Sequence, residues 1–493
     1  MLTRRELLKT SAQIGAAIAL PSAPFFARAD APGEIVVNDV QSQLNATRVH
    51  AIKPVRSLDD IQAALGEARR QGRAVSMAGG RHAMGGQQFG SDTVLLDTRH
   101  FNQVLKFDKA LGRITVEAGI EWPELIEHLQ NAQAGENQSW AIREKQTGVD
   151  RVSLGGSLAS NVHGRGLKFP PIVADVESFR LLGADGRLQT CSRKENQELF
   201  SLAIGGYGLF GIITHVTLRL APRTKVQRVV ELIPVKDLLP WVEKRLATGF
   251  VYGDCQYSTD LDGVADAHAG VFSCYRPVAD ATPIPAQQNQ LNAQDWIDFY
   301  TLARTDKKRA FEKYSAYYVS TNRQVYWSDT HQLAGSFDAY RNAVDKQRGT
   351  EMITEAYVTS DNFLPFMTKV RQDYLEHHVD MTYGTIRFIE KDTDTFLAWA
   401  REPSVCIVCN LHVMHTDSGK AKAAADFRRI IDRAIEFGGR YYLTYHRWAT
   451  RKQVEACYPQ FVDFLRLKKK YDPRELFQSE WYRHYKVMFA DKL

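Results

Sequence analysis

Three glycine-rich blocks in the first half of the chain constrain its fold more than any other feature. They are Ala-Gly-Gly-Arg-His at 78–82, Ser-Leu-Gly-Gly-Ser-Leu-Ala-Ser-Asn-Val-His-Gly at 153–164, and Gly-Gly-Tyr-Gly-Leu-Phe-Gly-Ile-Ile-Thr at 205–214. Glycine tolerates positive φ and lets another group approach the backbone closely, so such turns can bring N–H groups to phosphate oxygens. The pattern therefore predicts a site for a cofactor that contains a diphosphate.

Two common nucleotide sites do not fit these blocks. No Gly-x-Gly-x-x-Gly opens a helix with an acidic residue about 20 residues later, as a dinucleotide-binding βαβ unit requires. No Gly-x-x-x-x-Gly-Lys-Ser/Thr is present either, which argues against ATP or GTP on a P-loop.

The length and net charge of the chain limit its domain number and the kinds of partner it can bind. A chain of 493 residues with 44% hydrophobic residues can bury a large core, and its length indicates about two or three domains. The formal charge of +6 is small for this length, and no basic run is interleaved with aromatic residues, so we expect no nucleic-acid partner. We also expect no membrane span.

The N-terminus has the order of parts of a twin-arginine export signal. Arg4 and Arg5 precede an apolar stretch at 14–21, and Ala27-x-Ala29 supplies a small-residue cleavage pattern. The apolar stretch is too short to cross a bilayer. We expect residues 1–29 to be removed and the protein to be periplasmic or secreted; the alternative is an apolar N-terminal helix with an accidental arginine pair.

The six cysteines do not form a disulfide framework. Cys406 and Cys409 are the only close pair, in a strand-like run where side chains three residues apart point to opposite faces. Buried free thiols are therefore favoured over zinc or redox chemistry, and we expect no metal site.

Local patterns predict a mixed α and β organisation. Ser57 and the stripe Ile61, Leu65 and Ala68 predict a capped helix that ends near Gly72. Strands are expected at 74–78, 113–118, 178–182 and 212–220, a helix at 122–132, and a hairpin turn at 184–186. After Leu220 the composition changes, which indicates a second domain with strands at 382–389 and 405–413 and a helix at 420–437.

At these blocks the chain resembles the vanillyl-alcohol oxidase type of flavoprotein, whose FAD domain is also named after p-cresol methylhydroxylase. The motifs that carry the resemblance are the three glycine blocks, Leu-Leu-Gly-Ala-Asp-Gly at 181–186, residues 196–200, and Asp472-Pro473 followed by Phe477. Within that family the sequence is most similar to the sugar-lactone and alditol oxidases, with cytokinin dehydrogenases and decaprenylphosphoryl-ribose oxidases as further relatives.

The resemblance implies an α+β protein with a two-subdomain FAD-binding domain and an α+β cap, or substrate, domain. The implied boundaries are 45–225 for the FAD-binding domain, 226–440 for the cap, and 441–493 for a C-terminal segment that returns to the FAD domain.

Site residues for the cofactor follow from the same resemblance. In relatives a histidine in the first turn is bonded covalently to the flavin 8α-methyl, and His82 is its counterpart, although Arg81 and Ala83 replace the usual Gly and Ser neighbours. The alternative is that His82 only contacts the pyrophosphate or the ring. The cofactor-binding set is Ala78, Gly79, Gly80, Arg81, His82, Ala83, Gln87, Asp150, Ser153, Gly155, Gly156, Ser157, Asn161, His163, Gly164 and Ile213.

Such enzymes pass a hydride from a C–H that bears a hydroxyl or amine to flavin N5, while a base removes the heteroatom proton. Period two places Asn410 and His412 on one strand face, with Arg387 on a neighbouring strand. Tyr445 falls where alditol oxidases and decaprenylphosphoryl-ribose oxidases carry a lysine. A phenol with a pKa of about 10 is a poor base near pH 7, so His412 or His446 is the favoured proton acceptor; for each, a hydrogen-bonded structural role is the alternative.

The active-site glutamate of alditol oxidases falls on Thr385, so the alditol substrate is not transferred. We expect an FAD-dependent oxidoreductase that acts on the C–OH of a sugar, sugar lactone or polyol. Amine oxidation of the cytokinin-dehydrogenase kind is the main alternative, because Asp150 lies near the acid those enzymes use. A flavin-binding protein without turnover is a second alternative. Oxygen and other electron acceptors both stay open.

Overall fold

The computed structural model describes residues 34–260, 269–335 and 348–493. The export signal expected at 1–29 therefore lies outside the described residues. In the described part, no helix combines the length and apolar character that crossing a membrane requires.

The first subdomain is a small parallel sheet with the strand order β3-β5-β4. Ser57 caps α2 by accepting the N–H of Asp60, and Ile61, Leu65 and Ala68 are buried, as the sequence predicted. The strand β4 leads directly into the first glycine block. The elements are β1 (Ile35–Val37), β2 (Thr47–Val49), β3 (Ala51–Pro54), α2 (Leu58–Arg70), β4 (Val75–Ala78) and β5 (Val94–Asp97).

The second subdomain is a five-stranded antiparallel sheet of order β10-β9-β11-β7-β6. The expected hairpin is present, since β9 pairs with β10 around Gly186, whose φ is 86°. The elements are β6 (Val104–Asp108), β7 (Arg113–Glu117), α3 (Trp122–Ala132), β8 (Trp140–Ala141), α4 (Leu154–Ser160), η1 (Ile172–Asp175), β9 (Val176–Leu182), β10 (Leu188–Ser192), α5 (Gln197–Ala203), β11 (Ile212–Arg219) and β12 (Ala221–Pro222).

An eight-stranded antiparallel sheet forms the cap, in the order β16-β13-β15-β14-β18-β19-β17-β20. Its strands are β13 (Lys225–Pro234), β14 (Tyr252–Tyr257), β15 (Ala269–Val278), β16 (Val325–Trp327), β17 (Gly349–Val358), β18 (Met381–Ile389), β19 (Ser404–Met414) and β20 (Arg440–Tyr441). The helices are η2 (Val235–Asp237), α6 (Leu238–Ala247), α7 (Ala293–Thr305), α8 (Lys307–Ser320), η3 (Thr330–Gln332), α10 (Ser360–Glu376) and α11 (Asp417–Glu436).

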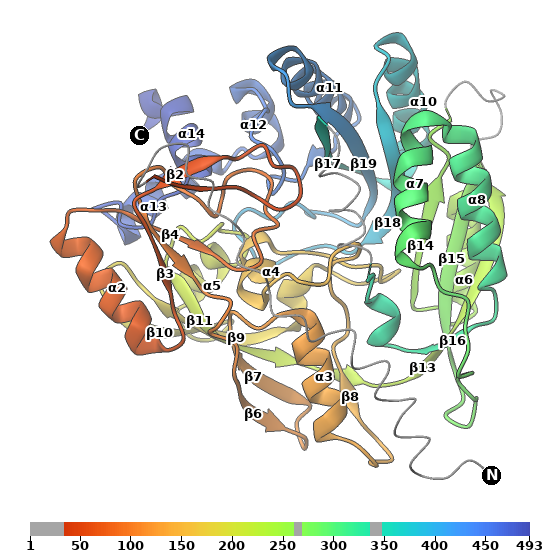
Figure 1. Cartoon of the computed structure of the whole chain (residues 1–493), viewed down its shortest axis with the longest axis horizontal. Helices are drawn as coiled ribbons and strands as arrows, with labels where there is room; N and C mark the ends of the chain where they lie inside the picture. Colours follow the sequence, from red (N-terminus) through yellow and green to blue (C-terminus); the bar gives the residue numbers. More distant parts are fainter. Residues whose placement is uncertain (1–33, 261–268, 336–347) are drawn as a thin grey trace.

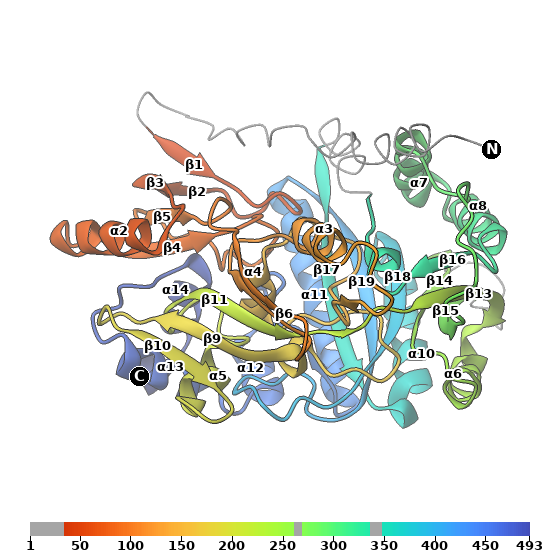
Figure 2. The same ribbon diagram turned by 90° about the horizontal axis from the view of Figure 1, so that it is seen from below.

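The two faces of the cap sheet differ in what covers them. Ile386, Ile407 and Cys409 belong to an apolar core shared with α6, α10 and α11. The other face looks toward the first two subdomains and, at its far end, is covered by α7 and α8 (Figures 1 and 2). Cys406 belongs to the core on that second side, so Cys406 and Cys409 point to opposite faces, as the sequence predicted. All six cysteines are buried and unpaired.

The C-terminal segment packs against the first two subdomains. Val75 in β4 exchanges backbone hydrogen bonds with Leu476 and Gln478, and Trp481 lies 4.7 Å from Tyr207 between ring centroids. The helices are α12 (Arg451–Cys457), α13 (Phe461–Tyr471), α14 (Glu480–Met488) and η4 (Ala490–Lys492).

Candidate active site

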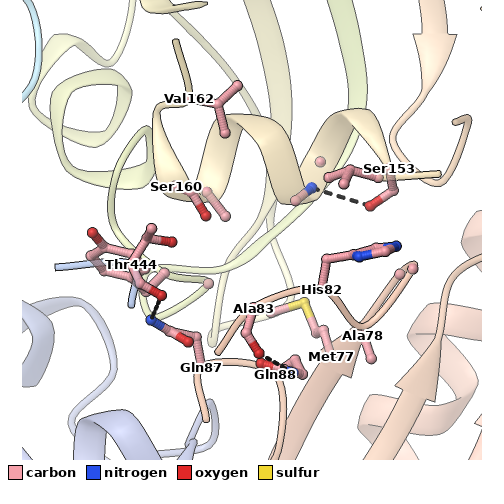
Figure 3. Close-up of a pocket in the computed structure, with 18 of the residues that line it drawn as sticks. Met77, Ala78, His82, Ala83, Gln87, Gln88, Ser153, Ser160, Val162 and Thr444 are labelled. Carbon is pink, nitrogen blue, oxygen red and sulfur yellow. Dashed lines mark hydrogen bonds between the residues drawn. The ribbon is translucent and has the colours of Figure 1, made fainter. Parts of the chain in front are cut away.

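A cleft runs between the first and second subdomains and ends against the cap sheet. All three glycine blocks line it, together with Glu355 from β17, Arg387 from β18 and the stretch 442–445 after β20. Figure 3 shows the first turn and α4 facing each other across the cleft, with Thr444 on a third side.

The first two glycine blocks touch each other. A Cβ on Gly79 would lie 2.2 Å from the Ser153 Oγ, and one on Gly80 would lie 2.1 Å from the Arg151 carbonyl oxygen. Neither position can hold a side chain, so the backbone of the turn borders the cleft directly. Arg81 itself adopts a left-handed φ of 61°, which turns the chain sharply at this point.

The second block forms the start of α4. The Ser153 Oγ accepts the N–H of Gly156 at 3.2 Å, and Gly155 packs on Ala118, whose Cβ would lie 3.1 Å from an added Cβ. Two bare glycine turns that face one cleft, one at a helix start, fit the diphosphate of a dinucleotide cofactor.

The third block forms the wall that holds the other end of the cofactor site. Residues 207–213 line the cleft, and Gly208 and Gly211 have φ of 73° and 149°. A Cβ on Gly206 would lie 1.9 Å from the Leu202 carbonyl oxygen. The glycines here are required by close packing of the backbone.

Twelve of the sixteen cofactor residues expected from the sequence line the cleft. These are Ala78, Gly79, Gly80, Arg81, His82, Ala83, Gln87, Ser153, Gly155, Gly156, His163 and Ile213.

The other four expected residues are not part of the lining, and their contacts lie within the surrounding protein. Asp150 pairs with Lys145 at 2.8 Å and accepts the N–H groups of residues 334 and 335. Ser157 accepts from Trp122 Nε1 at 3.2 Å. Asn161 ends α4 at φ 51° and donates to Asp392, and Gly164 packs on Glu144.

The imidazole of His82 is half-buried near the start of α4 and points away from Thr444 (Figure 3). Burial lowers the pKa of His82 to about 4, against the opposing effects of a hydrogen bond with the Arg151 backbone and the charge of Asp150. The ring is therefore neutral at pH 7, the state in which an imidazole nitrogen can act as a nucleophile.

A buried glutamate, Glu355, organises the cap end of the cleft. The Tyr445 hydroxyl donates to its Oε1 at 2.5 Å, and the Tyr357 hydroxyl donates to its Oε2 at 2.5 Å. His163 Nε2 lies 2.9 Å from the same Oε2. Burial alone would raise the pKa of Glu355, but the charges of His163 and Arg387 and the hydrogen bonds from His163 and Tyr357 lower it to about 2. Glu355 is thus an ionised carboxylate inside the protein.

The expected catalytic residues divide into two groups. Arg387 and Tyr445 line the cleft, whereas Asn410, His412 and His446 do not. Asn410 is on the cleft face of β19, but it lies opposite Ile353 and beyond Glu355 along the sheet. His412 lies four residues past Val408, the partner of Glu355, which is about 13 Å further along the strand.

His412 and His446, the expected proton acceptors, lie outside the lining of the cleft and contact other side chains. His412 Nδ1 contacts Glu351 at 3.3 Å. His446 stacks on Trp448 with 4.0 Å between ring centroids, and burial lowers its pKa to about 3. The neighbouring Tyr445 instead points toward Glu355, to which its hydroxyl donates a hydrogen bond.

Sequence reasoning missed Glu355. Glu355 pairs with Val408 on β19, and Val408 pairs with Thr385 on β18. The three residues share one row of the sheet, so the carboxylate lies two strands away from Thr385, where the resemblance placed the acid of alditol oxidases. The alternation of 349–358 could have placed Glu355 on a face, but its pairing with β19 was needed to bring it to the cleft.

His163, Glu355 and Cys406 present ligand-type atoms within 4.8 Å of one another. Burial raises the pKa of the Cys406 thiol well above its ordinary value, and the thiol lies 3.6 Å from Glu355 Oε2 as a hydrogen-bond donor. A protonated thiol is a poor metal ligand, so we interpret the three residues as part of one hydrogen-bonded network.

Residues 50–192 match the FAD binding domain family. The L-gulonolactone oxidase of Mus musculus is 23% identical over 449 residues, 86% of this chain and 92% of that protein. The L-gulono-1,4-lactone dehydrogenase of Mycobacterium tuberculosis is 21% identical over 431 residues, 85% of this chain and 92% of that protein. The D-arabinono-1,4-lactone oxidase of Debaryomyces hansenii is 28% identical over 202 residues, 38% of this chain and 35% of that protein.

Fold, cleft and comparisons agree on the class: the protein is an FAD-dependent oxidoreductase. Residues 50–192 form an FAD-binding domain of the p-cresol methylhydroxylase type, and the relatives that cover most of the chain are sugar-lactone oxidases and dehydrogenases.

Proposed function

We propose that this protein oxidises a CH–OH group of a sugar-like substrate, with sugar lactones as the first class to test. The observation that carries the proposal is the polar cap end of the cleft, where Glu355, Tyr445 and Arg387 converge. The names of the relatives, which act on gulono- and arabinono-lactones, support the same class.

The flavin, when bound, supplies the hydride acceptor. The backbones at Gly79, Gly80, Gly155 and Gly156 would hold its diphosphate, and the wall formed by 207–213 would hold the adenine side. Gln87 braces the cap end of the site, because its Nε2 donates to the Thr444 carbonyl at 2.8 Å.

Tyr445 and Glu355 provide a path for the substrate proton. A hydroxyl that donates to the Tyr445 oxygen can lose its proton there, while the Tyr445 proton moves to Glu355 Oε1 along the existing hydrogen bond. The O–H bond of the substrate breaks, the phenol is restored, and Glu355 becomes a carboxylic acid. A carboxylate with a pKa of about 2 is a weak base, but a hydroxyl becomes strongly acidic as its carbon loses a hydride.

The alternative hypothesis, amine oxidation of the cytokinin-dehydrogenase kind, was based on Asp150. That carboxylate is bound by Lys145 and by two backbone N–H groups outside the cleft, so it is not positioned to accept a proton from a substrate amine. Oxidation of a CH–OH group is therefore the better-supported function.

The test begins with the visible absorption of the purified protein and continues with anaerobic mixing against sugar lactones, alditols, aldoses and amines. We expect yellow protein whose flavin is bleached by one or more hydroxylated substrates and not by amines. Bleaching by amines alone would contradict the proposal. Bound flavin that no substrate reduces would favour a flavin-binding protein without turnover.

We further propose export by the twin-arginine route, which supports a periplasmic or secreted location. The support is the order Arg4-Arg5, apolar stretch and Ala27-x-Ala29 in the sequence. Replacing both arginines with lysine should leave the full-length protein in the cytoplasm. Unchanged export of this variant would reject the twin-arginine route.

A further inference from the structure

Beyond Arg387, away from Glu355, a second set of polar side chains lies on the same face of the cap sheet. Gln256 in β14 pairs with Thr385 in β18, and Cys255 pairs with Ile386. The register therefore sets Asp254 opposite Arg387. Because Cys255 and Ile386 belong to the apolar core on the helix side, Asp254 and Arg387 point to the side of the cleft.

These charged groups are buried without direct partners. Asp254 and Arg387 are 7% and 8% exposed, and neither side chain forms a hydrogen bond with the residues that the structure describes. The Nε atoms of Arg387 and Arg165 and the Oε1 of Gln256 are also buried without a hydrogen-bond partner. Buried polar groups are rarely left in this state, because each lost hydrogen bond costs about 1–3 kcal/mol.

The charges are close enough to affect one another. Burial alone would lower the pKa of Arg387. The charges of Glu355 and Asp254 outweigh this effect and raise the pKa above its ordinary value. The same opposition holds for Arg165, where Asp254 has the largest raising effect. Asp254 is thus within electrostatic range of two guanidinium groups, one from β18 and one from the loop after α4.

Aromatic side chains enclose this group from two further elements. Tyr383 accepts a hydrogen bond from Gln256 Nε2, and Tyr314 and Tyr318 of α8 interact electrostatically with Asp254. Tyr383, Gln256, Arg165 and the two α8 tyrosines are all only partly buried. Solvent therefore reaches the side chains around Asp254 and Arg387.

The chemistry selects one class of ligand. Asp254 and the Gln256 oxygen accept hydrogen bonds, whereas the two guanidinium groups donate them. Asp254 would repel a ligand carboxylate, and Arg165 and Arg387 would repel a ligand ammonium. A hydroxyl both donates and accepts, so a neutral chain with several hydroxyls satisfies both kinds of group.

We propose that Asp254, with Arg165, Arg387 and Gln256, forms a subsite for the hydroxyl groups of the substrate that lie away from the oxidised carbon. The assignment rests on the proposed function, because it treats the ligand as the molecule oxidised at Tyr445. Asp254 is then a specificity residue and takes no part in proton transfer.

The experiment pairs Asp254→Asn with two lactones: an aldonolactone with a hydroxylated side chain, and the matching hydroxylactone ring without that side chain. In the FAD-loaded enzyme we expect Asp254→Asn to lower kcat/KM for the side-chain lactone about 10- to 100-fold, mainly through KM, because hydrogen bonds to a charged group are lost. We expect kcat/KM for the bare ring to stay within about twofold.

Asp373→Asn is the matched control. Asp373 is a buried cap carboxylate that pairs with Arg433 at 2.7 Å among the helices on the opposite side of the sheet. This variant should lose thermal stability but keep the wild-type discrimination between the two lactones.

A second measurement does not depend on turnover. Calorimetric titration with a side-chain lactone whose reacting hydroxyl has been removed should show binding to the wild type and at least about tenfold weaker binding to Asp254→Asn. Equal binding to both proteins, or no binding to the wild type, would overturn the subsite. If no lactone bleaches the flavin while binding still depends on Asp254, the proposed function fails and the subsite stands.

Discussion

The phenol of Tyr445 donates a 2.5 Å hydrogen bond to a carboxylate, Glu355, that is 3% exposed and ionised. The two residues are 90 positions apart in the chain. The backbone of Tyr445 also packs closely on Gly85, because a Cβ added to Gly85 would lie 2.3 Å from the Tyr445 carbonyl oxygen. The segment that follows the first glycine block therefore packs against the backbone of the residue that starts the proton path.

Removal of the phenol oxygen should stop proton transfer and leave the flavin bound. We expect Tyr445→Phe to slow flavin bleaching by the best substrate about 10²- to 10⁴-fold, the range of general acid–base effects. Rapid-mixing absorbance under anaerobic conditions measures the rate. His446→Phe is the control: its ring should still stack on Trp448, and the bleaching rate should stay within about threefold of wild type. If His446→Phe has the larger effect, the assignment of Tyr445 is wrong.

Neutralising Glu355 should act through Tyr445. We expect Glu355→Gln to slow bleaching by a factor of about 10 to 100 and to add little to Tyr445→Phe in the double variant, because the two residues act as one unit. Glu355→Asp should recover part of the rate. Additive losses in the double variant would show that Glu355 affects the fold or the flavin rather than Tyr445.

Acid pH offers a separate test of Glu355. Its pKa falls from 4.5 to about 2 on folding, so its ionised form stabilises the fold above about pH 4.5, and this stabilisation is lost as pH falls toward 2. The groups that face Glu355 are His163, Tyr357, Arg387, Cys406, Tyr442 and Tyr445.

The difference in melting temperature between wild type and Glu355→Gln should therefore be largest above pH 4.5 and should narrow below it. Glu144 and Asp175, whose pKa values burial raises to about 7 and about 6, shift both proteins alike and cancel in the difference. A gap that widens on acidification would contradict an ionised Glu355.

The cofactor site could be predicted from the sequence better than the catalytic end, for a physical reason. At Gly79 and Gly80 the backbone packs closely on the second glycine block. The geometry therefore requires glycine, and glycine can be recognised in the sequence. At 405–413 alternation correctly placed Asn410 and His412 on one face, but the distance to the cofactor depends on strand register across the sheet. Glu355 and Asp254 required the pairing of β17 and β14 with their neighbours, which local patterns do not contain.

The glycine turns give a prediction about flavin content. Gly80→Ala should yield folded protein with little or no flavin, because its Cβ would lie 2.1 Å from a backbone oxygen that cannot move aside. Gly66→Ala in α2 is the control, since the nearest atom is 3.5 Å away at the tip of Arg70 and alanine favours a helix. The ratio of visible to ultraviolet absorbance measures occupancy. Full flavin content in Gly80→Ala would remove the first turn from the site.

The final prediction concerns the bond to the cofactor. We propose a covalent link from His82 to the flavin 8α-methyl, supported by the position of His82 in the cleft and by the neutral state that a pKa of about 4 gives its ring. After acid precipitation the yellow colour of the wild type should stay in the pellet, and that of His82→Ala should pass to the supernatant. His484→Ala, which removes a ring outside the cleft with a similarly lowered pKa of about 4, should behave as wild type. Colour released from the wild type itself would show that His82 only contacts the flavin, and the neutral imidazole would then serve to fill the space between the first turn and α4.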